Sequence, residues 1–352
     1  MNKGKNMKQY TKIALAVLAL TSAGIASADV EMYGKASAGI GKTYTHSVKN
    51  VKVDDQGSYI GFKGNESLSD QAKAIWQVEQ AVQLDGDSKG QSYVNSLRDS
   101  YVGLQHNKLG TVKVGKNTSS YKEVGSELDL FRDETASVEA GYGRFNQRIK
   151  NSVKYDTPDV YGLSGSVTYG TAENRKANSK VKSDVYSTAL NYQLNDKFKV
   201  GAGYERRNDI LGSSDYAYGV KAATSYEFGN GALVGTGAER IVYNPKHEAG
   251  KRQKQDAVTV SGVMPVGNVD LQGNYTRLFD ARGQKDTGAN IYTVGAKYNL
   301  SKRTALGSYY SMIDNDKNGA HDFANNGVTA DNNSVLVGEN VRSFGATLSH
   351  KF

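Results

Sequence analysis

The sequence predicts an all-β protein, a 16-stranded antiparallel transmembrane β-barrel with an inward-folded third loop. Three observations lead to this prediction: the chain opens with a short secretory signal, segments of alternating polarity recur to its last residue, and the connections between them alternate in length. The mean hydropathy of −0.58 and the hydrophobic fraction of 38% agree with a barrel, because strands that alternate lipid-facing and lumen-facing residues keep average hydropathy low.

Residues 1–28 have the composition of a secretory signal peptide. They contain four lysines and no acid, then the apolar run Ile13–Leu20, then an A-S-A site at 26–28. An N-terminal membrane anchor is the alternative, but eight apolar residues fall short of the roughly 20 that a helix needs to cross a bilayer. We therefore expect cleavage before Asp29 and export of residues 29–352.

The composition of the exported part excludes several classes of protein. Without the four lysines of the signal, the formal net charge falls from +8 to +4. A net charge this small does not indicate a nucleic-acid partner. The chain has no cysteine, so no disulfide can stabilise it outside the cytoplasm. No long apolar run follows residue 28, which excludes helical membrane spans.

Segments of period-two alternation, bounded by turn residues, supply the expected strands. In the first, Val30, Met32 and Ile40 share one face, and Glu31 and Lys35 share the other. The sixteen segments are 29–40, 58–64, 73–82, 99–106, 111–117, 149–156, 163–170, 185–194, 198–207, 216–228, 232–243, 256–266, 269–279, 290–300, 304–313 and 342–352.

The connections between these segments alternate long and short, beginning with a long one after the first strand. A membrane barrel has this rhythm, because its periplasmic turns are short and its outer loops are long. An even strand number lets the first and last strands pair and leaves no open edge in lipid. The terminal segment R-S-F-G-A-T-L-S-H-K-F is therefore expected to pair with the strand that begins near Val30. Tyrosines near strand ends would form the aromatic girdles at the two membrane surfaces.

Several blocks of the sequence resemble the general porins of Gram-negative bacteria, neisserial type. These are S-Y-I-G-F-K-G-N-E-S-L, K-A-I-W-Q-V-E-Q, N-S-V-K-Y-D-T-P-D-V-Y-G-L-S-G-S-V-T-Y-G, Y-N-L-S-K-R-T and the C-terminal segment. The resemblance implies a homotrimer in outer-membrane lipid and lipopolysaccharide, with one pore per barrel for small hydrophilic solutes and ions. It also implies that Phe352 belongs to an assembly signal read by the barrel assembly machinery.

The candidate site residues lie on one loop and on the wall that would face it. Residues 118–148 form a connection too long to be a simple turn, and its acids would line the constriction if the loop folds inward; an exposed surface loop is the alternative. Alternation places five lysines on the polar face of their strands, since a lipid-facing lysine would cost about 2–4 kcal/mol at midplane. The candidates are Glu123, Glu127, Asp129, Asp133 and Glu134 on the loop, and Lys35, Lys63, Lys113, Lys150 and Lys154 on the wall.

The function expected from these features is a passive, water-filled channel with weak anion preference and no cofactor or metal. The motif D-N-D-K-N-G at Asp314–Gly319 matches the start of a calcium loop but lacks the final glutamate, so a polar turn is the better interpretation. No catalytic grouping or plug domain indicates an enzyme or a gated transporter. The alternative function is an adhesin whose exposed loops contact host surfaces.

Overall fold

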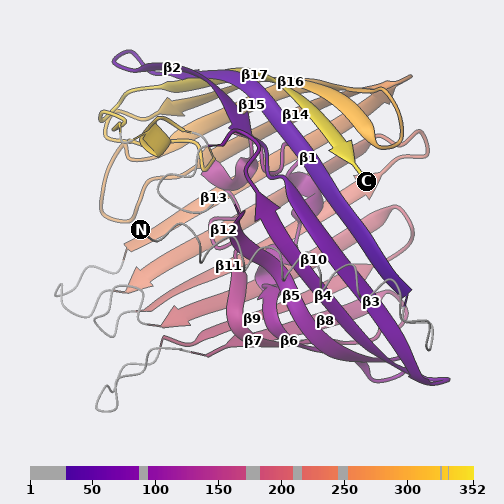
Figure 1. The fold of residues 1–352 in the computed structure, drawn as a ribbon. Coiled ribbons are helices and arrows are strands. Elements are labelled where there is room, and N and C mark those ends of the chain that lie inside the picture. The colour runs from indigo at the N-terminus through magenta and orange to yellow at the C-terminus, as the bar shows by residue number, and fades with distance from the viewer. Residues whose placement is uncertain are drawn as a thin grey trace, which may run out of the picture.

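A single antiparallel sheet curves round and closes on itself in the computed structural model (Figure 1). The structure describes residues 29–86, 94–171, 183–208, 216–244, 253–325, 327–331 and 333–352, so the predicted signal peptide lies outside the described residues. The strands are β1 (Asp29–Tyr44), β2 (Lys49–Asp55), β3 (Tyr59–Ser69), β4 (Ala72–Val82), β5 (Val94–His106), β6 (Gly110–Thr118), β7 (Arg148–Asp156), β8 (Leu163–Gly170), β9 (Val185–Gln193), β10 (Phe198–Asn208), β11 (Tyr216–Glu227), β12 (Leu233–Asn244), β13 (Gln253–Val266), β14 (Val269–Leu278), β15 (Ala289–Asn299), β16 (Thr304–Asn315) and β17 (Val341–Lys351). In this part of the chain, no helix is both long and apolar enough to span a bilayer.

The first and last strands close the barrel, as predicted. β1 pairs with β17 in an unbroken antiparallel register from Lys35 opposite Lys351 to Tyr44 opposite Arg342. Beyond the register, Gly34 N donates to Phe352 O at 3.0 Å and Phe352 N donates to Gly34 O at 3.1 Å. The terminal residue thus satisfies backbone groups that would otherwise face hydrocarbon unpaired.

The elements β2 and β3 form one barrel strand with an interruption, so sixteen strands surround the lumen. β1 pairs with β2 over 38–44 and with β3 over 29–35. The break lies at 56–58, where Gly57 has a φ of +72° that favours glycine. The expectation of a long first loop was wrong, because β2 continues the hairpin and leaves only residues 45–48 as the connection.

Alternation separates an apolar outer face from a polar inner face. Val102, Leu104 and Val114 are exposed on the outside. Buried hydroxyls point inward and bond across neighbouring strands, for example Thr259 to Thr276 at 2.8 Å. Every β-barrel in lipid needs this division, because the outer side chains meet hydrocarbon while the inner ones meet water and each other.

The connections at the two ends of the barrel differ in length. Those at the β3–β4 end have at most six residues: 70–71, 107–109, 157–162, 194–197, 228–232, 267–268 and 300–303. The connections longer than six residues lie at the other end, and they include 119–147 and 316–340. We call residues 119–147 the inner loop and residues 316–340 the last loop.

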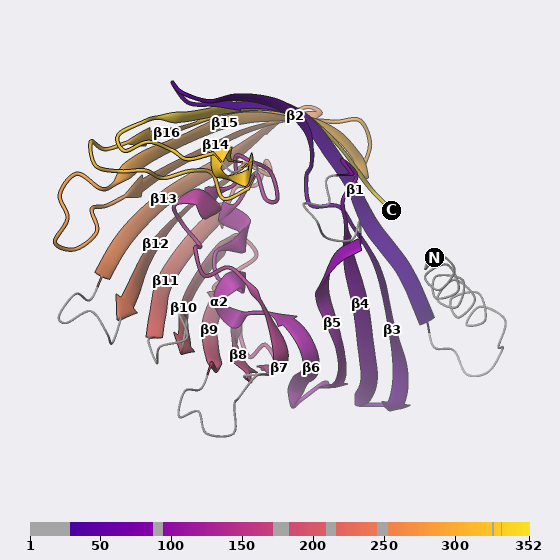
Figure 2. The ribbon, with the colours of Figure 1, turned by 60° about the vertical axis from the view of Figure 1, so that its left-hand side comes forward.

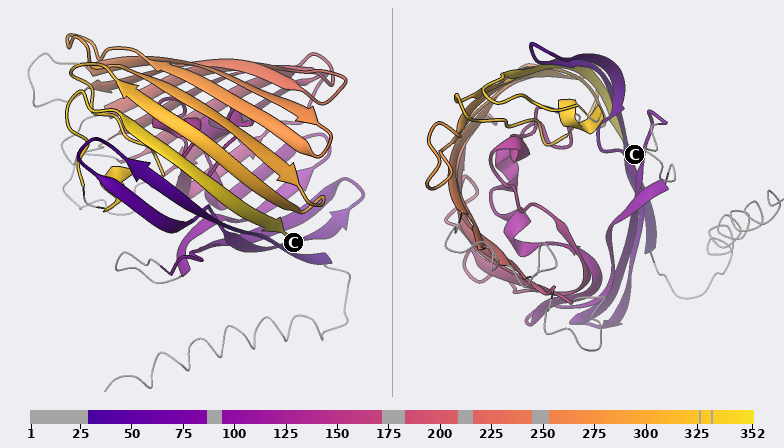
Figure 3. Two further views of the ribbon diagram at one scale, coloured as in Figure 1. Left: turned by 90° about the horizontal axis from the view of Figure 1, so that it is seen from above. Right: turned by 90° about the vertical axis from the view of Figure 1, so that its left-hand side faces the viewer.

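The inner loop folds into the barrel, as predicted. It contains the short helix α2 (Ser120–Glu123) and the 3₁₀ turns η1 (Ser126–Leu128) and η2 (Val138–Ala140). Figure 2 shows it in magenta within the curve of the sheet, and the end-on view in Figure 3 shows it inside the ring of strands. The last loop, in yellow with the 3₁₀ turn η3 (Val328–Asp331), also lies inside the ring, near its rim. Two loops therefore narrow the lumen.

Candidate pore constriction

The inner loop packs its apolar side chains against the inside of the wall. Val124, Leu128 and Tyr142 form a buried cluster with the wall residues Ala189 and Ala223. Two further clusters join Tyr121 and Phe145 to Ala217 and Ile241, and Phe131 and Ala136 to Tyr309. Buried apolar contacts therefore hold the loop against the wall from Tyr121 to Phe145. The polar side chains on the other side of the loop face the open part of the lumen.

Glycines of the wall make room for these side chains. A Cβ atom at Gly237 would lie 2.5 Å from Tyr142 Oη, and one at Gly295 would lie 2.6 Å from Phe131 Cε1. One at Gly235 would overlap Leu128 in the same way. These glycines sit inside strands, where glycine is normally unfavourable. Close approach of the inner loop accounts for them.

Buried polar groups fix the docked position more precisely than apolar contacts can. Tyr121 Oη donates to Glu239 Oε1 at 2.6 Å, and Arg144 Nε donates to Glu239 Oε2 at 3.2 Å. Lys221 Nζ donates to Asn146 Oδ1 at 3.1 Å and lies 4.5 Å from the ring centre of Tyr121. Burying a charge is costly unless it is paired and hydrogen-bonded. Moving the loop would leave Glu239 and Lys221 without these partners.

The polar side of the inner loop faces β5, β6 and β7 across a cavity of about 260 Å³. Its charged lining is balanced in number, with five cations and five acids. These are Arg98, Lys122, Arg132, Arg148 and Lys221, and Asp99, Glu123, Asp129, Asp133 and Glu139. This cavity is the candidate constriction.

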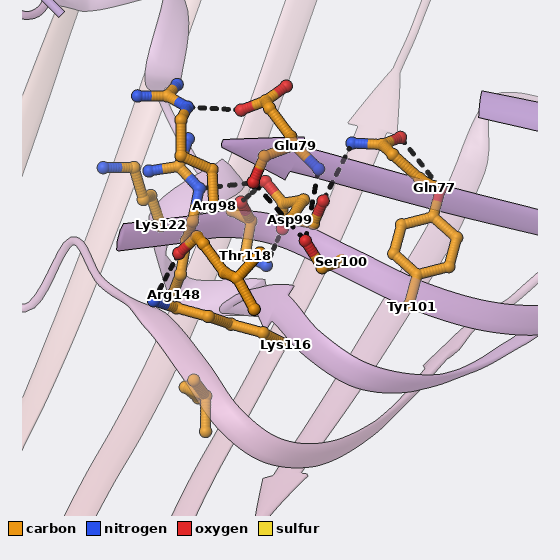
Figure 4. Close-up of polar contacts among 12 residues, drawn as sticks. Gln77, Glu79, Arg98, Asp99, Ser100, Tyr101, Lys116, Thr118, Lys122 and Arg148 are labelled. Carbon is orange, nitrogen blue, oxygen red and sulfur yellow. Dashed lines mark hydrogen bonds and ion pairs between the residues drawn. The ribbon is translucent and has the colours of Figure 1, made fainter. Parts of the chain in front are cut away.

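Three of the lining cations come from three different segments and gather on one side. Arg98 of β5 pairs with Glu79, Arg148 of β7 pairs with Asp99 at 3.0 Å, and Lys122 of α2 pairs with Glu139 at 3.3 Å. Figure 4 shows Arg98, Lys122 and Arg148 grouped together, with Asp99 and Thr118 beside them. Each cation forms an ion pair with one carboxylate and lines the cavity.

Two of the wall lysines expected at the constriction meet expected loop acids. Lys35 Nζ lies 3.3 Å from Asp133 Oδ2. Lys154 forms an ion pair with Glu123 and donates to the backbone oxygen of Thr118 at 3.3 Å. Lys154 is only 2% exposed, so it anchors the start of the loop and hardly faces the water path.

The other wall lysines lie elsewhere. Lys113 faces inward but pairs with Asp156 on its own wall at 2.8 Å. Lys63 pairs with Glu31 at 3.1 Å nearer the short-turn end, beside a separate cavity of about 390 Å³. Neither lysine contacts the inner loop through these pairs.

Lys150 departs from the predicted inward orientation. Opposite Gly115 and Asn117 the strand β7 contains one extra residue, a β-bulge, and Asn151 within it has a φ of +50°. The bulge turns Ile149 inward, where it is buried, and leaves Lys150 exposed. An extra residue reverses which face the later side chains occupy.

The remaining loop acids are held within the inner loop or against the wall. Glu127 accepts from Ser225 Oγ at 2.8 Å, and Asp129 accepts from Ser137 Oγ at 3.0 Å. Burial raises the pKa of Asp129 to about 6 and that of Glu134 to about 7. Both carboxyls lie on the loop, outside the membrane-spanning strands, and both keep their protons to a higher pH than an exposed acid.

Period-two reasoning missed several lining residues, among them Arg98, Asp99 and Arg148. The register of β4 and β5 slips twice, between Val78 and Gln80 and between Gln80 and Val82, because β5 contains extra residues there. As a result the consecutive residues Arg98 and Asp99 both line the cavity. The basic residues Lys122 and Arg132 also line the cavity, and they lie in the segment 118–148 that was expected to fold inward.

The last loop locks the inner loop at the outer mouth. Its Phe323 and Val328 are buried against Ile291 and Ile313 of the wall, and Ala140 of the inner loop packs on the same cluster. Asn325 Nδ2 donates to the backbone oxygen of Glu134 at 3.2 Å. In the D-N-D-K-N-G motif, Asp316 pairs with Arg277 at 2.7 Å, as in a polar turn.

Comparison with known proteins gives one family. A family model described as Gram-negative porin matches residues 14–318. The chain is 31% identical over 329 residues to the major outer membrane protein P.IB of Neisseria sicca, covering 83% of this chain and 90% of that protein. It is 30% identical over 328 residues to the protein of the same name from Neisseria gonorrhoeae, with the same coverage.

Solved structures share the architecture at lower identity. The anion-selective porin from Comamonas acidovorans superposes with a TM-score of 0.78 at 21% identity, over 93% of this chain and all of that one. OmpT of Vibrio cholerae, solved in a trimer form, superposes with a TM-score of 0.68 at 16% identity, over 93% of this chain and all of that one. At these identities the likeness establishes the barrel fold.

Proposed function

The chain belongs to the Gram-negative porin family, and from this premise we propose that its channel prefers anions weakly and is narrowest where the inner loop faces β5, β6 and β7. As a porin it lies in the outer membrane, where its barrel forms a water-filled channel for passive diffusion of small hydrophilic solutes and ions. The proposal concerns the selectivity of that channel and the residues that set it.

The charge balance of the cavity supports a weak preference. Five cations face five acids, so a large net field is absent. Asp129 has a pKa of about 6, and Glu134 beside the cavity has a pKa of about 7, so part of the negative charge is neutralised near neutral pH. Arg132 is exposed, and its guanidinium donates to the backbone oxygen of Ser126. A low-dielectric wall focuses the remaining positive field into the aqueous path.

Reversal potentials across a planar bilayer in a salt gradient test this proposal. Replacing Arg98 and Arg148 by Gln together should remove the anion preference, and the change should be larger at low salt, where screening is weak. Lys63→Gln is the control, because it removes an inward cation nearer the other end of the lumen. If the double variant shifts the reversal potential, per charge removed, no more than Lys63→Gln does, the constriction lies elsewhere.

We also infer a homotrimer surrounded by outer-membrane lipid and lipopolysaccharide. The support is family membership, together with the trimer form of the structurally similar OmpT and the broad apolar outer face of this barrel. Native mass spectrometry in mild detergent distinguishes a trimer from a monomer directly, and a dominant monomer would contradict the inference.

For export and assembly, we propose that residues 1–28 are the cleaved signal and that Phe352 is read by the barrel assembly machinery. Phe352 supports this role by its position, since its ring packs over Gly34 while its backbone completes the closing pair. The mass of the mature chain tests the cleavage site: the proposal expects Asp29 at its N-terminus.

A further inference from the structure

Three tyrosines line the inner wall between the constriction and the short-turn end of the barrel. Tyr59 of β3 stands opposite the inward Lys35, and Tyr33 of β1 lies two residues from that lysine, so both share its face. Tyr101 of β5 precedes Val102, which is exposed on the outer face, so Tyr101 also faces inward. We call Tyr33, Tyr59 and Tyr101 the tyrosine row.

The strand register places the tyrosine row at three successive levels of the wall. On β3 these levels are those of Tyr59, Gly61 and Lys63. Tyr33 stands opposite Gly61, and Tyr101 reaches the level of Lys63 through the pairing of β4 with both of its neighbours. Residues two apart on a strand are separated by about 6.6 Å, and the ring centres of Tyr33 and Tyr59 lie 6.1 Å apart. A solute moving along this wall therefore passes from one ring to the next.

Each ring of the tyrosine row has a cation beside it. The distances from the cation to the ring centre are 4.7 Å for Arg98 Cζ and Tyr59, 5.1 Å for Lys63 Nζ and Tyr33, and 5.3 Å for Lys113 Nζ and Tyr101. Every level thus presents the same pair of groups, an aromatic ring and a positive charge.

Hydrogen bonds hold these groups in place. Glu79 accepts from Tyr33 Oη at 3.0 Å and forms an ion pair with Arg98. Tyr101 Oη donates to Gln77 Oε1 at 3.3 Å, and Figure 4 shows this contact together with that of Arg98 and Glu79. All three rings stay partly exposed. Because the rings are already fixed, a ligand that contacts them loses little affinity to the ordering of side chains.

The tyrosine row connects two cavities of the lumen. Arg98 lines the constriction cavity of about 260 Å³. Tyr101 and Lys63 line the cavity of about 390 Å³ nearer the short-turn end, together with the amides of Asn65 and Gln77. The volume of this second cavity falls within the range of about 300–1,000 Å³ found for small-molecule sites.

We propose that the tyrosine row and its cations bind small aromatic monocarboxylates as they cross the channel. The ring of the solute stacks in an offset arrangement on a tyrosine, and its carboxylate accepts charge-assisted hydrogen bonds from the neighbouring lysine or arginine. The inference rests on the proposed anion preference of the channel and names one class of anion that the wall recognises.

Block of the ion current through the full-length channel in a planar bilayer tests the proposal. The probes at neutral pH are benzoate, cyclohexanecarboxylate, which keeps the charge but has no aromatic ring, and benzyl alcohol, which keeps the ring but has no charge. Benzoate should bind at least about fivefold more tightly than either, which corresponds to about 1 kcal/mol for one aromatic contact. Equal block by cyclohexanecarboxylate or by benzyl alcohol would overturn the proposal, and so would equal block by a neutral hexose.

Substitutions of the tyrosine row show whether the rings are responsible. The variant Tyr33→Leu, Tyr59→Leu, Tyr101→Leu should bind benzoate at least about fivefold more weakly and lose its advantage over cyclohexanecarboxylate. The corresponding triple phenylalanine variant keeps the rings and should bind benzoate as the wild type does. If the phenylalanine variant loses as much affinity as the leucine variant, the hydroxyls act and the proposed stacking is wrong.

A matched control and a milder variant complete the test. The control removes three exposed tyrosines of the outer face and should leave benzoate block unchanged: Tyr204→Leu, Tyr226→Leu, Tyr275→Leu. If the triple leucine variant of the row does not fold, Tyr101→Leu alone decides the matter, because the Tyr101 hydroxyl bonds to the neutral amide of Gln77. Benzoate block as in the wild type in Tyr101→Leu, or equally weakened in the control, would contradict the assignment.

This inference and the proposed function fail separately. The reversal potential of the wild-type channel in a potassium chloride gradient measures the proposed anion preference. The ratio of benzoate to cyclohexanecarboxylate affinities measures recognition by the tyrosine row. A ratio near one in a channel that prefers chloride would refute the tyrosine row alone, and a channel without chloride preference that still distinguishes the two carboxylates would refute only the proposed selectivity.

Discussion

Replacing Tyr121 by phenylalanine removes one hydroxyl that holds the inner loop in the lumen. The Tyr121 side chain is fully buried, and its hydroxyl donates to the buried carboxylate of Glu239 at 2.6 Å. A hydrogen bond to a charged group contributes about 1.5–3 kcal/mol. At about 2 kcal/mol, the population of undocked loop should rise roughly 30-fold, because every 1.4 kcal/mol is tenfold.

Amide hydrogen exchange measures that population. In the Tyr121→Phe channel, the amides of residues 121–128 should exchange roughly 30-fold faster, while those of the strands keep wild-type rates. Single-channel records should show larger current fluctuations for the same reason. Tyr204→Phe is the control, since Tyr204 is exposed on the outer face. Exchange within twofold of wild type would refute the idea that the buried Tyr121–Glu239 contact holds the loop.

Three further predictions concern pH, assembly and the outer mouth. Burial raises the pKa of Glu134 from 4.5 to about 7, so its carboxyl stays protonated in the docked loop up to about pH 7. As the pH rises from 4.5 to about 7, the docked loop gains negative charge and loses stability relative to the undocked loop. Reversal potentials should therefore show a stronger anion preference at pH 5 than at pH 8, and Glu134→Gln should reduce this difference; a pH dependence unaltered by Glu134→Gln would contradict the assignment. Deleting Phe352 should lower the amount of folded barrel in the outer membrane and leave export intact, which fractionation and heat-modified gel mobility measure; wild-type levels would remove its assembly role. Deleting residues 320–337 should raise single-channel conductance, because the last loop lies inside the ring of strands. The chain can be rejoined across the deletion, since Gly338 N donates to Gly319 O at 2.7 Å. An unchanged conductance would mean that the last loop does not narrow the path.

The strands were predictable because lipid imposes a strict alternation on them. Lys113 between Val112 and Val114 can face only inward, and the sequence shows this directly. The closing pair was predictable for a related reason, since a barrel in hydrocarbon has no acceptable open edge for Phe352 to leave unpaired. Both inferences use constraints that act on every residue of a strand.

The details of the constriction were not predictable from alternation, because one inserted residue changes which side chain faces the lumen. The bulge in β7 turns Lys150 outward, and the slips in β5 bring Arg98 and Asp99 inward together. In β7, Ile149 and Val153 lie four residues apart, as if they shared one face, so the pattern gives no signal of the insertion. The position of the inner loop depends on glycines that are distant in the sequence, such as Gly237. Gly237 leaves room for the Tyr142 ring, and this contact cannot be read from the sequence.

The contact between Gly34 and Phe352 sets the order in which the molecule can fold. These residues lie 318 positions apart in the sequence (352 − 34), so the entropy lost in closing that loop opposes the formation of their hydrogen bonds. Pairings between neighbouring strands are local and can form early, whereas the seam between β1 and β17 must wait until the last residue has been made. Until then both edges of the sheet are unpaired and prone to aggregate. The seam is thus the step at which a chaperone or membrane catalyst would have the greatest effect on the folding rate.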